Sequence, residues 1–206
     1  MKKLIGILIS SLLCFACLMG CGKTEADPNL ETLNQALEAI NQTSSGTLTI
    51  NYVEQGQEYA AETIQYTLDG GKVTFSREEY ETEGDSNLYK YENDILYREM
   101  EDNEGKYEMY DSQIRYKTLS DIAGVNLKPL ESDKIDSITT EQQGEYVVYT
   151  VVIPQDALLL ASDDEQTPVV IDALTKRYYL DNQNSLKKVE FDFDSTVEMT
   201  LQVEFS

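Results

Sequence analysis

At Gly46 the hydrophobic period of this 206-residue chain changes from about 3.6 residues to about two, and it stays near two almost to the C-terminus. In a strand, successive side chains point to opposite faces, so this alternation is typical of strands with one buried face. The last stretch alternates most regularly, and we expect Val197, Met199, Leu201, Val203 and Phe205 to point inward. The pattern predicts strands over residues 47–54, 60–68, 72–79, 88–91, 95–100, 106–110, 136–142, 145–153, 168–181, 186–194 and 197–206.

Helical spacing is confined to a few short segments. Leu30, Leu33, Leu37 and Ile40 recur at steps of three and four, which predicts an amphipathic helix over 29–42 with Asn29 as its cap. Shorter helices are expected within 112–123 and over 154–160. Because so many antiparallel strands cannot lie flat with bare edges, we expect an α+β fold. A strongly curved antiparallel sheet of about ten or eleven strands would wrap the N-terminal helix and one or two short helices.

Composition excludes several classes of function. The chain carries 16 Lys and Arg against 38 Asp and Glu, a formal net charge of -22, so a nucleic-acid partner is not expected. It has no His, and therefore lacks the usual general base and the commonest neutral metal ligand. No Ser–Lys pair has a recognisable spacing, and some of so many carboxylates will lie close together by chance. We expect neither catalysis, nor a cofactor, nor a bound metal.

The N-terminal segment has the pattern of an export signal. Lys2 and Lys3 precede an apolar run over residues 4–19, which predicts a signal peptide over 1–20. The run ends in Leu18-Met19-Gly20-Cys21, which resembles the bacterial lipobox. The resemblance implies cleavage before Cys21 and a diacylglycerol on its sulfur, which would anchor the protein outside the cytoplasm on the cell membrane. Residues 21–28 would then be the lipidated cysteine and a tether. The alternatives are an ordinary signal peptide or modification of Cys17.

The order of elements over 29–206 resembles that of a known superfamily of single-domain proteins. A lipobox, a short tether, an amphipathic helix, a long Tyr-rich meander and a closing pair of strands around 182–185 follow one another. This order is similar to the half-barrel superfamily of the lipoprotein localisation factors and the mycobacterial lipid-carrying lipoproteins. The resemblance implies a half-barrel sheet around helices, with an apolar cavity for acyl chains. The localisation factors also use particular Arg and aromatic residues, which match no positions here, so no functional residue is carried over.

Two predicted strands, 145–153 and 168–180, are apolar on both faces. One reading is that helices cap one face and the other lines a ligand cleft. The alternative is a central strand covered by the 154–160 helix and loops. Under the first reading the ligand-binding residues would be Tyr146, Val148, Val152, Val169, Ile171 and Tyr179.

Two further clusters allow more than one interpretation. Seven tyrosines between 80 and 116 would either form a surface for a partner or pair across strands to stabilise the sheet; they are Tyr80, Tyr89, Tyr91, Tyr97, Tyr107, Tyr110 and Tyr116. The acidic sets 163–165 and Glu190, Asp192 and Asp194 would either hold Ca²⁺ or form a solvated face.

The sequence therefore predicts a membrane-anchored lipoprotein that binds an apolar or amphiphilic ligand, such as a lipid, in the concave face of its sheet. The alternative is a protein-interaction or envelope-sensing module that binds an envelope protein through a Tyr-rich outer face. A scaffold without any ligand is a third reading.

Overall fold

The sheet consists of two meanders that meet at the first and last strands of the chain. In the computed structural model, which describes residues 27–81, 85–101, 103–158, 166–193 and 199–206, eleven strands follow the order β6-β5-β4-β3-β2-β1-β11-β10-β9-β8-β7. Every neighbouring pair is antiparallel. The strands are β1 (Ser45–Glu54), β2 (Gln57–Asp69), β3 (Lys72–Tyr80), β4 (Ser86–Glu92), β5 (Ile95–Met100), β6 (Asn103–Asp111), β7 (Ser137–Gln143), β8 (Tyr146–Val152), β9 (Thr175–Leu180), β10 (Leu186–Phe193) and β11 (Met199–Phe205).

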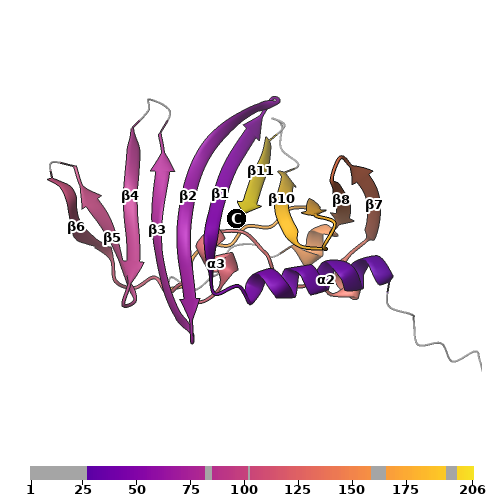
Figure 1. Ribbon diagram of the computed structural model, residues 1–206, viewed down its shortest axis with the longest axis horizontal. Helices are drawn as coiled ribbons and strands as arrows, with labels where there is room; N and C mark the ends of the chain where they lie inside the picture. The colour runs from indigo at the N-terminus through magenta and orange to yellow at the C-terminus, as the bar shows by residue number, and fades with distance from the viewer. Residues whose placement is uncertain (1–26, 82–84, 102, 159–165, 194–198) are drawn as a thin grey trace, which may run out of the picture.

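The chain runs outward from β1 to the edge strand β6 and then crosses to the opposite edge, β7. From there it returns inward until β11 pairs with β1, with Leu48 opposite Phe205 and Ile50 opposite Val203. The two edge strands do not pair with each other, so the curved sheet stays open, with the helices along one side (Figure 1). The expected α+β half-barrel with a curved antiparallel sheet is confirmed.

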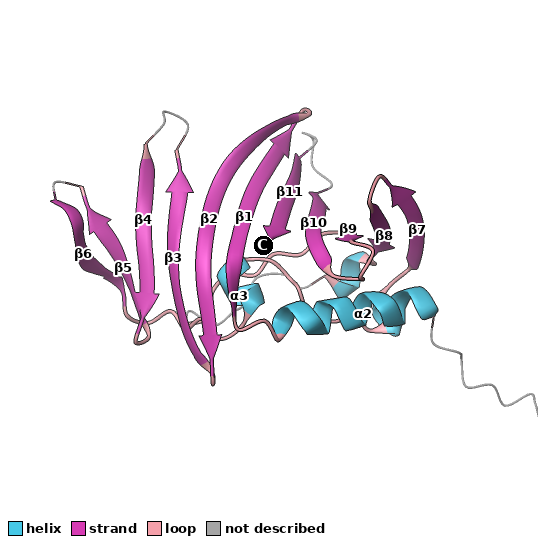
Figure 2. Ribbon diagram, in the orientation of Figure 1, coloured by secondary structure: helices cyan, strands magenta, loops and turns pink. Residues whose placement is uncertain are grey.

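Helix α2 (Pro28–Asn41) covers part of the face of the sheet that we call the inner face (Figure 2). Leu33, Ala36 and Leu37 pack there into one core with residues such as Ile64 and Phe191. The helix begins one residue earlier than predicted and its cap is Asp27, not Asn29, because the Asp27 side chain accepts from the Asn29 N–H at 2.9 Å. Pro28 occupies the first turn, where its missing N–H leaves no hydrogen bond unmade.

A crossing segment, residues 112–136, fills much of the inner face between the two meanders. Leu119, Ile122, Val125 and Leu127 are all buried in the core. The predicted helix over 112–123 is reduced to α3 (Leu119–Ala123), which has a capping box and ends at Gly124 with φ of +67°. A single 3₁₀ turn, Ser132–Lys134, follows.

Two asparagines of α2 hold the crossing segment by its backbone. Asn34 Nδ2 donates to Leu130 O at 2.8 Å, and Asn34 Oδ1 accepts from Leu130 N at 2.7 Å. Asn41 Nδ2 donates to Leu127 O at 2.8 Å. Because the two asparagines are two helical turns apart, they lie on one face of α2 and fix an extended stretch of the segment.

The strand predicted over 168–181 is wrong in its first half, because β9 begins only at Thr175. Residues 168–174 lie instead along the crossing segment, where Ile171 bridges Val125 in parallel and exchanges backbone hydrogen bonds with Gly124 and Asn126. This run is apolar because it packs beneath another loop. Over 154–160 the structure has one 3₁₀ turn, Gln155–Ala157, and residues 159–160 lie outside the described part.

In the closing strand, Leu201, Val203 and Phe205 are buried as predicted, but Met199 is exposed and Val197 lies outside the described residues. Among the helices of the described residues, none has the length and apolar character needed to cross a membrane.

We predict that Asn34→Ala lowers the free energy of unfolding by about 2 kcal/mol, because it leaves the N–H and C=O of Leu130 without partners. Denaturant unfolding monitored by circular dichroism measures the change. Glu38→Ala, at an exposed position of the same helix, is the control and should change stability by less than about 0.5 kcal/mol. Equal denaturation midpoints for the two variants would contradict the prediction.

Candidate ligand-binding groove

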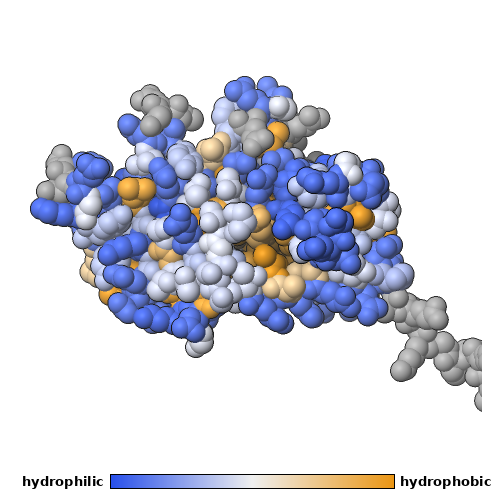
Figure 3. All heavy atoms as spheres, viewed as in Figure 1, coloured by the Kyte–Doolittle hydropathy of each residue, from blue (hydrophilic) through white to orange (hydrophobic). Residues whose placement is uncertain are grey.

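A groove with a lining of mixed polar and apolar character opens between α2 and the adjoining rim of the sheet. Ala36, Ala39 and Ile40 line one wall, because steps of three and four residues place them on one face of the helix. The groove has a volume of about 510 Å³, within the range of about 300–1,000 Å³ common for small-molecule sites. Figure 3 shows hydrophobic surface just above α2 in this region. The sheet side is formed by Tyr66, Leu186 and Phe205.

Polar residues also line the groove. The turn between β9 and β10 contributes Gln183, Asn184 and Ser185, and Lys187 follows at the start of β10. Lys187 Nζ lies 3.5 Å from Asp181 Oδ2, and its side chain is 45 % exposed. A cation and amides, together with the apolar side chains, match the two chemical parts of an amphiphilic molecule.

Gly46 allows the floor of this groove to form. A Cβ at this position would lie 3.0 Å from Tyr66 Oη and 3.2 Å from the backbone oxygen of Ser206. The glycine therefore lets the Tyr66 ring lie against β1 at the groove, where burial raises the pKa of its hydroxyl.

The predicted ligand residues do not line this groove. Tyr146, Val148, Val152 and Tyr179 lie on the outer face, opposite the core, since Tyr149 and Val151 of the same strand point into the core. Val148 is fully buried there, and the Tyr146 and Tyr179 rings meet edge to face at 6.2 Å.

The other two members of that set lie in the loop before β9. Val169 is 58 % exposed, and Ile171 is half-buried against the crossing segment. The six residues thus do not share one cavity, and their contact with a ligand stays a prediction. The alternation of residues along the strand showed that both faces of β8 are apolar. It could not show that neighbouring side chains cover the outer face.

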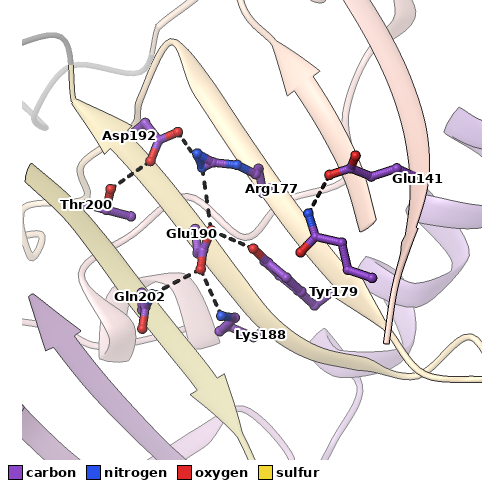
Figure 4. Close-up of polar contacts among 9 residues, drawn as sticks. Glu141, Arg177, Tyr179, Lys188, Glu190, Asp192, Thr200 and Gln202 are labelled. Carbon is purple, nitrogen blue, oxygen red and sulfur yellow. Dashed lines mark hydrogen bonds and ion pairs between the residues drawn. The ribbon is translucent and has the colours of Figure 1, made fainter. Parts of the chain in front are cut away.

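The acidic row on β10 is part of a polar cluster on the outer face, drawn in Figure 4. Glu190 is only 8 % exposed. It accepts from Tyr179 Oη at 2.7 Å, from Lys188 Nζ at 2.8 Å and from Gln202 Nε2 at 3.0 Å. Asp192 accepts from Arg177 at 2.6 Å and from Thr200 Oγ1 at 2.8 Å. Both carboxylates are ion-paired. The solvated-face interpretation is wrong for the buried Glu190, whereas the Asp192 side chain keeps 26 % of its surface exposed.

The Ca²⁺ interpretation finds no support in the described part of the chain, where no cluster of three or more Asp, Glu, His or Cys could hold a metal ion. Asp194 and residues 163–165 lie outside the described residues. Within the outer-face cluster, burial and the hydrogen bond to Glu190 raise the pKa of Tyr179 far above its ordinary value, because an ionised phenol would be desolvated and would face a carboxylate.

The seven tyrosines do not form a single outer surface. Tyr91 and Tyr116 are buried with Phe75, whose ring stacks on Tyr91 at 5.4 Å and meets Tyr116 edge to face at 4.9 Å. Tyr89 and Tyr110 pair edge to face, as the stabilising interpretation expects. The remaining three are Tyr80, which is exposed, and Tyr97 and Tyr107, whose rings flank Lys90.

A buried charged cluster beneath the crossing segment escaped the sequence reasoning. Lys176 Nζ lies 2.9 Å from Asp172 Oδ1, and both side chains are almost fully buried. Asn126 Nδ2 donates to Asp172 Oδ2 at 2.8 Å. Burial alone would lower the pKa of Lys176, but attraction to Tyr178 and Asp172 outweighs it and raises that pKa. The only sign in the sequence that Lys176 is buried was its position in the strand, because it alternates with the core residues Tyr178 and Leu180 and so lies on the same face.

The open sheet, the helix on its inner face and the rim groove are the architecture of a half-barrel protein. The same fold is found in the lipoprotein LppX of Mycobacterium tuberculosis, with 10 % identity, 88 % of this chain and 95 % of that chain covered, and a TM-score of 0.53. The LolA superfamily protein NE2245 of Nitrosomonas europaea matches with a lower TM-score of 0.35, at 9 % identity, over 86 % of this chain and 91 % of that chain. MucB of Pseudomonas aeruginosa, in its complex with MucA, matches with a TM-score of 0.44, at 12 % identity, over 87 % of this chain and 58 % of that chain.

No family model matches the sequence, and no curated protein matches it. The likeness to LppX is therefore one of three-dimensional structure, and it confirms the half-barrel fold that the sequence resemblance implied.

We predict that Tyr179→Phe lowers the free energy of unfolding at pH 7 by about 1.5–3 kcal/mol, the range for hydrogen bonds to charged groups. Folding raises the pKa of Tyr179 above its unfolded-state value near 10. The stability that this shift adds is fully present below about pH 10 and is lost as the pH rises through the higher, folded-state pKa. The difference between wild type and variant should therefore shrink above about pH 10, as followed by urea unfolding at several pH values.

Tyr80→Phe is the control for Tyr179→Phe, because the Tyr80 hydroxyl is exposed and lies 3.3 Å from Glu78. It should change stability by less than about 0.5 kcal/mol. A stability loss for Tyr179→Phe that is independent of pH up to strongly alkaline conditions would rule out the proposed hydrogen bond.

Proposed function

We propose that the chain is a membrane-anchored, extracytoplasmic lipoprotein that binds an apolar or amphiphilic ligand, such as a lipid, without catalysing a reaction. The groove beside α2 carries this proposal, because it combines apolar side chains of the helix and the sheet with polar groups that include the cation of Lys187. An acyl chain in the groove would gain about 0.8 kcal/mol for each methylene removed from water.

The site is expected at the rim of the inner face, because the centre of that face is filled. Leu119, Ile122, Val125 and Leu127 of the crossing segment occupy it together with α2. A ligand would therefore lie along the helix, with its tail over Ala39 and Ile40 and its head near Lys187. The fold shared with LppX, itself a lipoprotein by name, agrees with this assignment.

The membrane anchor rests on the lipobox and on the position of α2. Cys21 precedes the helix by only a few residues, so the groove along that helix would lie close to the bilayer. Seven residues of extended chain span at most roughly 25 Å. A groove held at that distance could receive a ligand directly from the outer leaflet.

One observation favours a protein partner as a second candidate function. Met109 and Tyr110 on the edge strand β6 are 63 % and 60 % exposed, and Tyr80 is exposed on β3. An edge strand has unpaired backbone groups that a partner strand can join. An envelope protein would then bind at this edge and leave the groove free.

We predict that Ala39→Trp weakens the binding of a fluorescent fatty acid at least tenfold, because the indole would fill the groove. The assay uses fluorescence titration of the chain carrying Cys21→Ser, with native mass spectrometry and an organic extract to identify any lipid that copurifies. Glu38→Trp, at the adjacent exposed position outside the groove lining, is the matched control and should bind as the parent does. A parent protein that binds neither fatty acids nor phospholipids would refute the ligand proposal.

We further predict that Cys21→Ser abolishes lipidation, because serine offers no thiol for the diacylglycerol. Labelling of a bacterial host with a clickable palmitate, followed by mass spectrometry of the N-terminal peptide, should place the lipid on Cys21 in the wild type. Cys17→Ser is the control and should be labelled normally. Label on Cys17, or its absence from the wild type, would contradict the assignment.

A further inference from the structure

The buried charged cluster brings an amine, a carboxamide and a carboxylate together from three segments of the chain. Lys176 lies on β9, Asp172 in the loop before it and Asn126 in the crossing segment. All three are less than a tenth exposed. One carboxylate contacts both partners, since Asp172 Oδ1 lies 2.9 Å from Lys176 Nζ and its Oδ2 accepts from Asn126 Nδ2 at 2.8 Å.

The environment of this cluster is poor in water and only partly satisfies the ammonium group. Lys176 Nζ and the hydroxyl of Tyr178 interact with each other, but neither has a well-aligned hydrogen bond among the described residues. The ring centroid of Phe191 is 6.0 Å from Nζ. Attraction to Tyr178 and Asp172 outweighs burial and raises the pKa of Lys176, so its amine is charged at rest. The Asp172 carboxylate, 2.9 Å from Nζ, is the group placed to accept a proton from this amine when it reacts.

The contacts of Asn126 also match the needs of an acyl-transfer reaction. Asn126 Oδ1 accepts a hydrogen bond from the Lys128 backbone N–H at 3.2 Å. Negative charge would develop on this oxygen if a nucleophile attacked the amide carbon, so the N–H is placed to stabilise it. Asn126 Nδ2, the leaving nitrogen, already faces a carboxylate that can deliver a proton. A nucleophile, a proton relay and an oxyanion donor are thus held in one dry site.

We propose that Lys176 and Asn126 join in an intramolecular amide bond, with Asp172 as the proton relay. Lys176 gives one proton to Asp172, and its free amine attacks Cγ of Asn126. Asp172 then protonates Nδ2, the Cγ–Nδ2 bond breaks, and ammonia leaves. The second proton of the former amine passes through Asp172 to the ammonia. One ammonium and one carboxamide thus become one amide and one ammonium ion, with no oxidant or co-reactant.

The bond would join the crossing segment to β9 covalently. It would link two residues that are fifty positions apart, and a cross-link of that span restricts the unfolded chain strongly. In a body without cysteine this amide would take the structural place of a disulfide.

Tryptic peptide mapping of the purified full-length protein, denatured and reduced before digestion, tests the proposal. The expected product is a branched peptide that joins residues 118–134 to residues 135–177, lighter than the sum of its parts by one ammonia and uncut after Lys176. Recovery of the linear peptides 118–134 and 135–176 from the wild type would overturn the proposal. A product lighter by one water, with its bond at Asp172, would overturn the choice of Asn126.

Variants separate the roles within the cluster. Lys176→Arg keeps a cation opposite Asp172 but removes the nucleophilic amine, so the branched peptide should disappear. Asp172→Asn should reduce its yield at least tenfold, because the relay is lost. Lys134→Arg, at an exposed site ion-paired with Glu131, is the control and should retain the full yield. Because the wild-type map decides by itself, a variant that fails to fold leaves the test intact.

Discussion

Pairing of β1 with β11 is the contact that holds the two meanders in one sheet. The first half of the body runs away from β1 and the second half runs back toward it, so only this pair joins them edge to edge. Leu48, Ile50 and Val203 face inward on the paired strands and are all buried in the core. The open edges then fall at β6 and β7, and the connection between them has to pass over the inner face.

The crossing segment determines which part of the inner face is filled and which part is open. It carries its own apolar residues into the centre of the inner face, and Asn34, Asn41 and Asp172 hold it there through hydrogen bonds. A large central cavity is therefore replaced by a packed core. The open space moves to the rim beside α2, where helix and sheet diverge around the β9–β10 turn. The proposed ligand groove and the packed core thus lie in different parts of the same fold.

Much of the fold could be predicted from the spacing of apolar residues alone. A strand or helix that buries one face needs apolar residues at its own regular interval, whatever it packs against. The N-terminal helix and ten of the strands fall where their patterns place them. The pattern failed at 168–174, where an apolar run is buried by a loop, and at 112–123, where apolar residues fill the core with little helix. The candidate site was harder to predict, since its walls come from α2, β2, β10 and β11, which only the folded sheet brings together.

By itself, the sequence determined the class of fold, because that follows from the local hydrophobic period. A single domain and a membrane anchor stay predictions from its composition and its short N-terminal motif. The tertiary structure alone decided which apolar faces are core and which are open. Glu190 and Lys176 look like surface charges in the sequence, yet each is buried against partners from other strands or loops. Burial depends on contacts between residues distant in sequence, and no local pattern records those contacts.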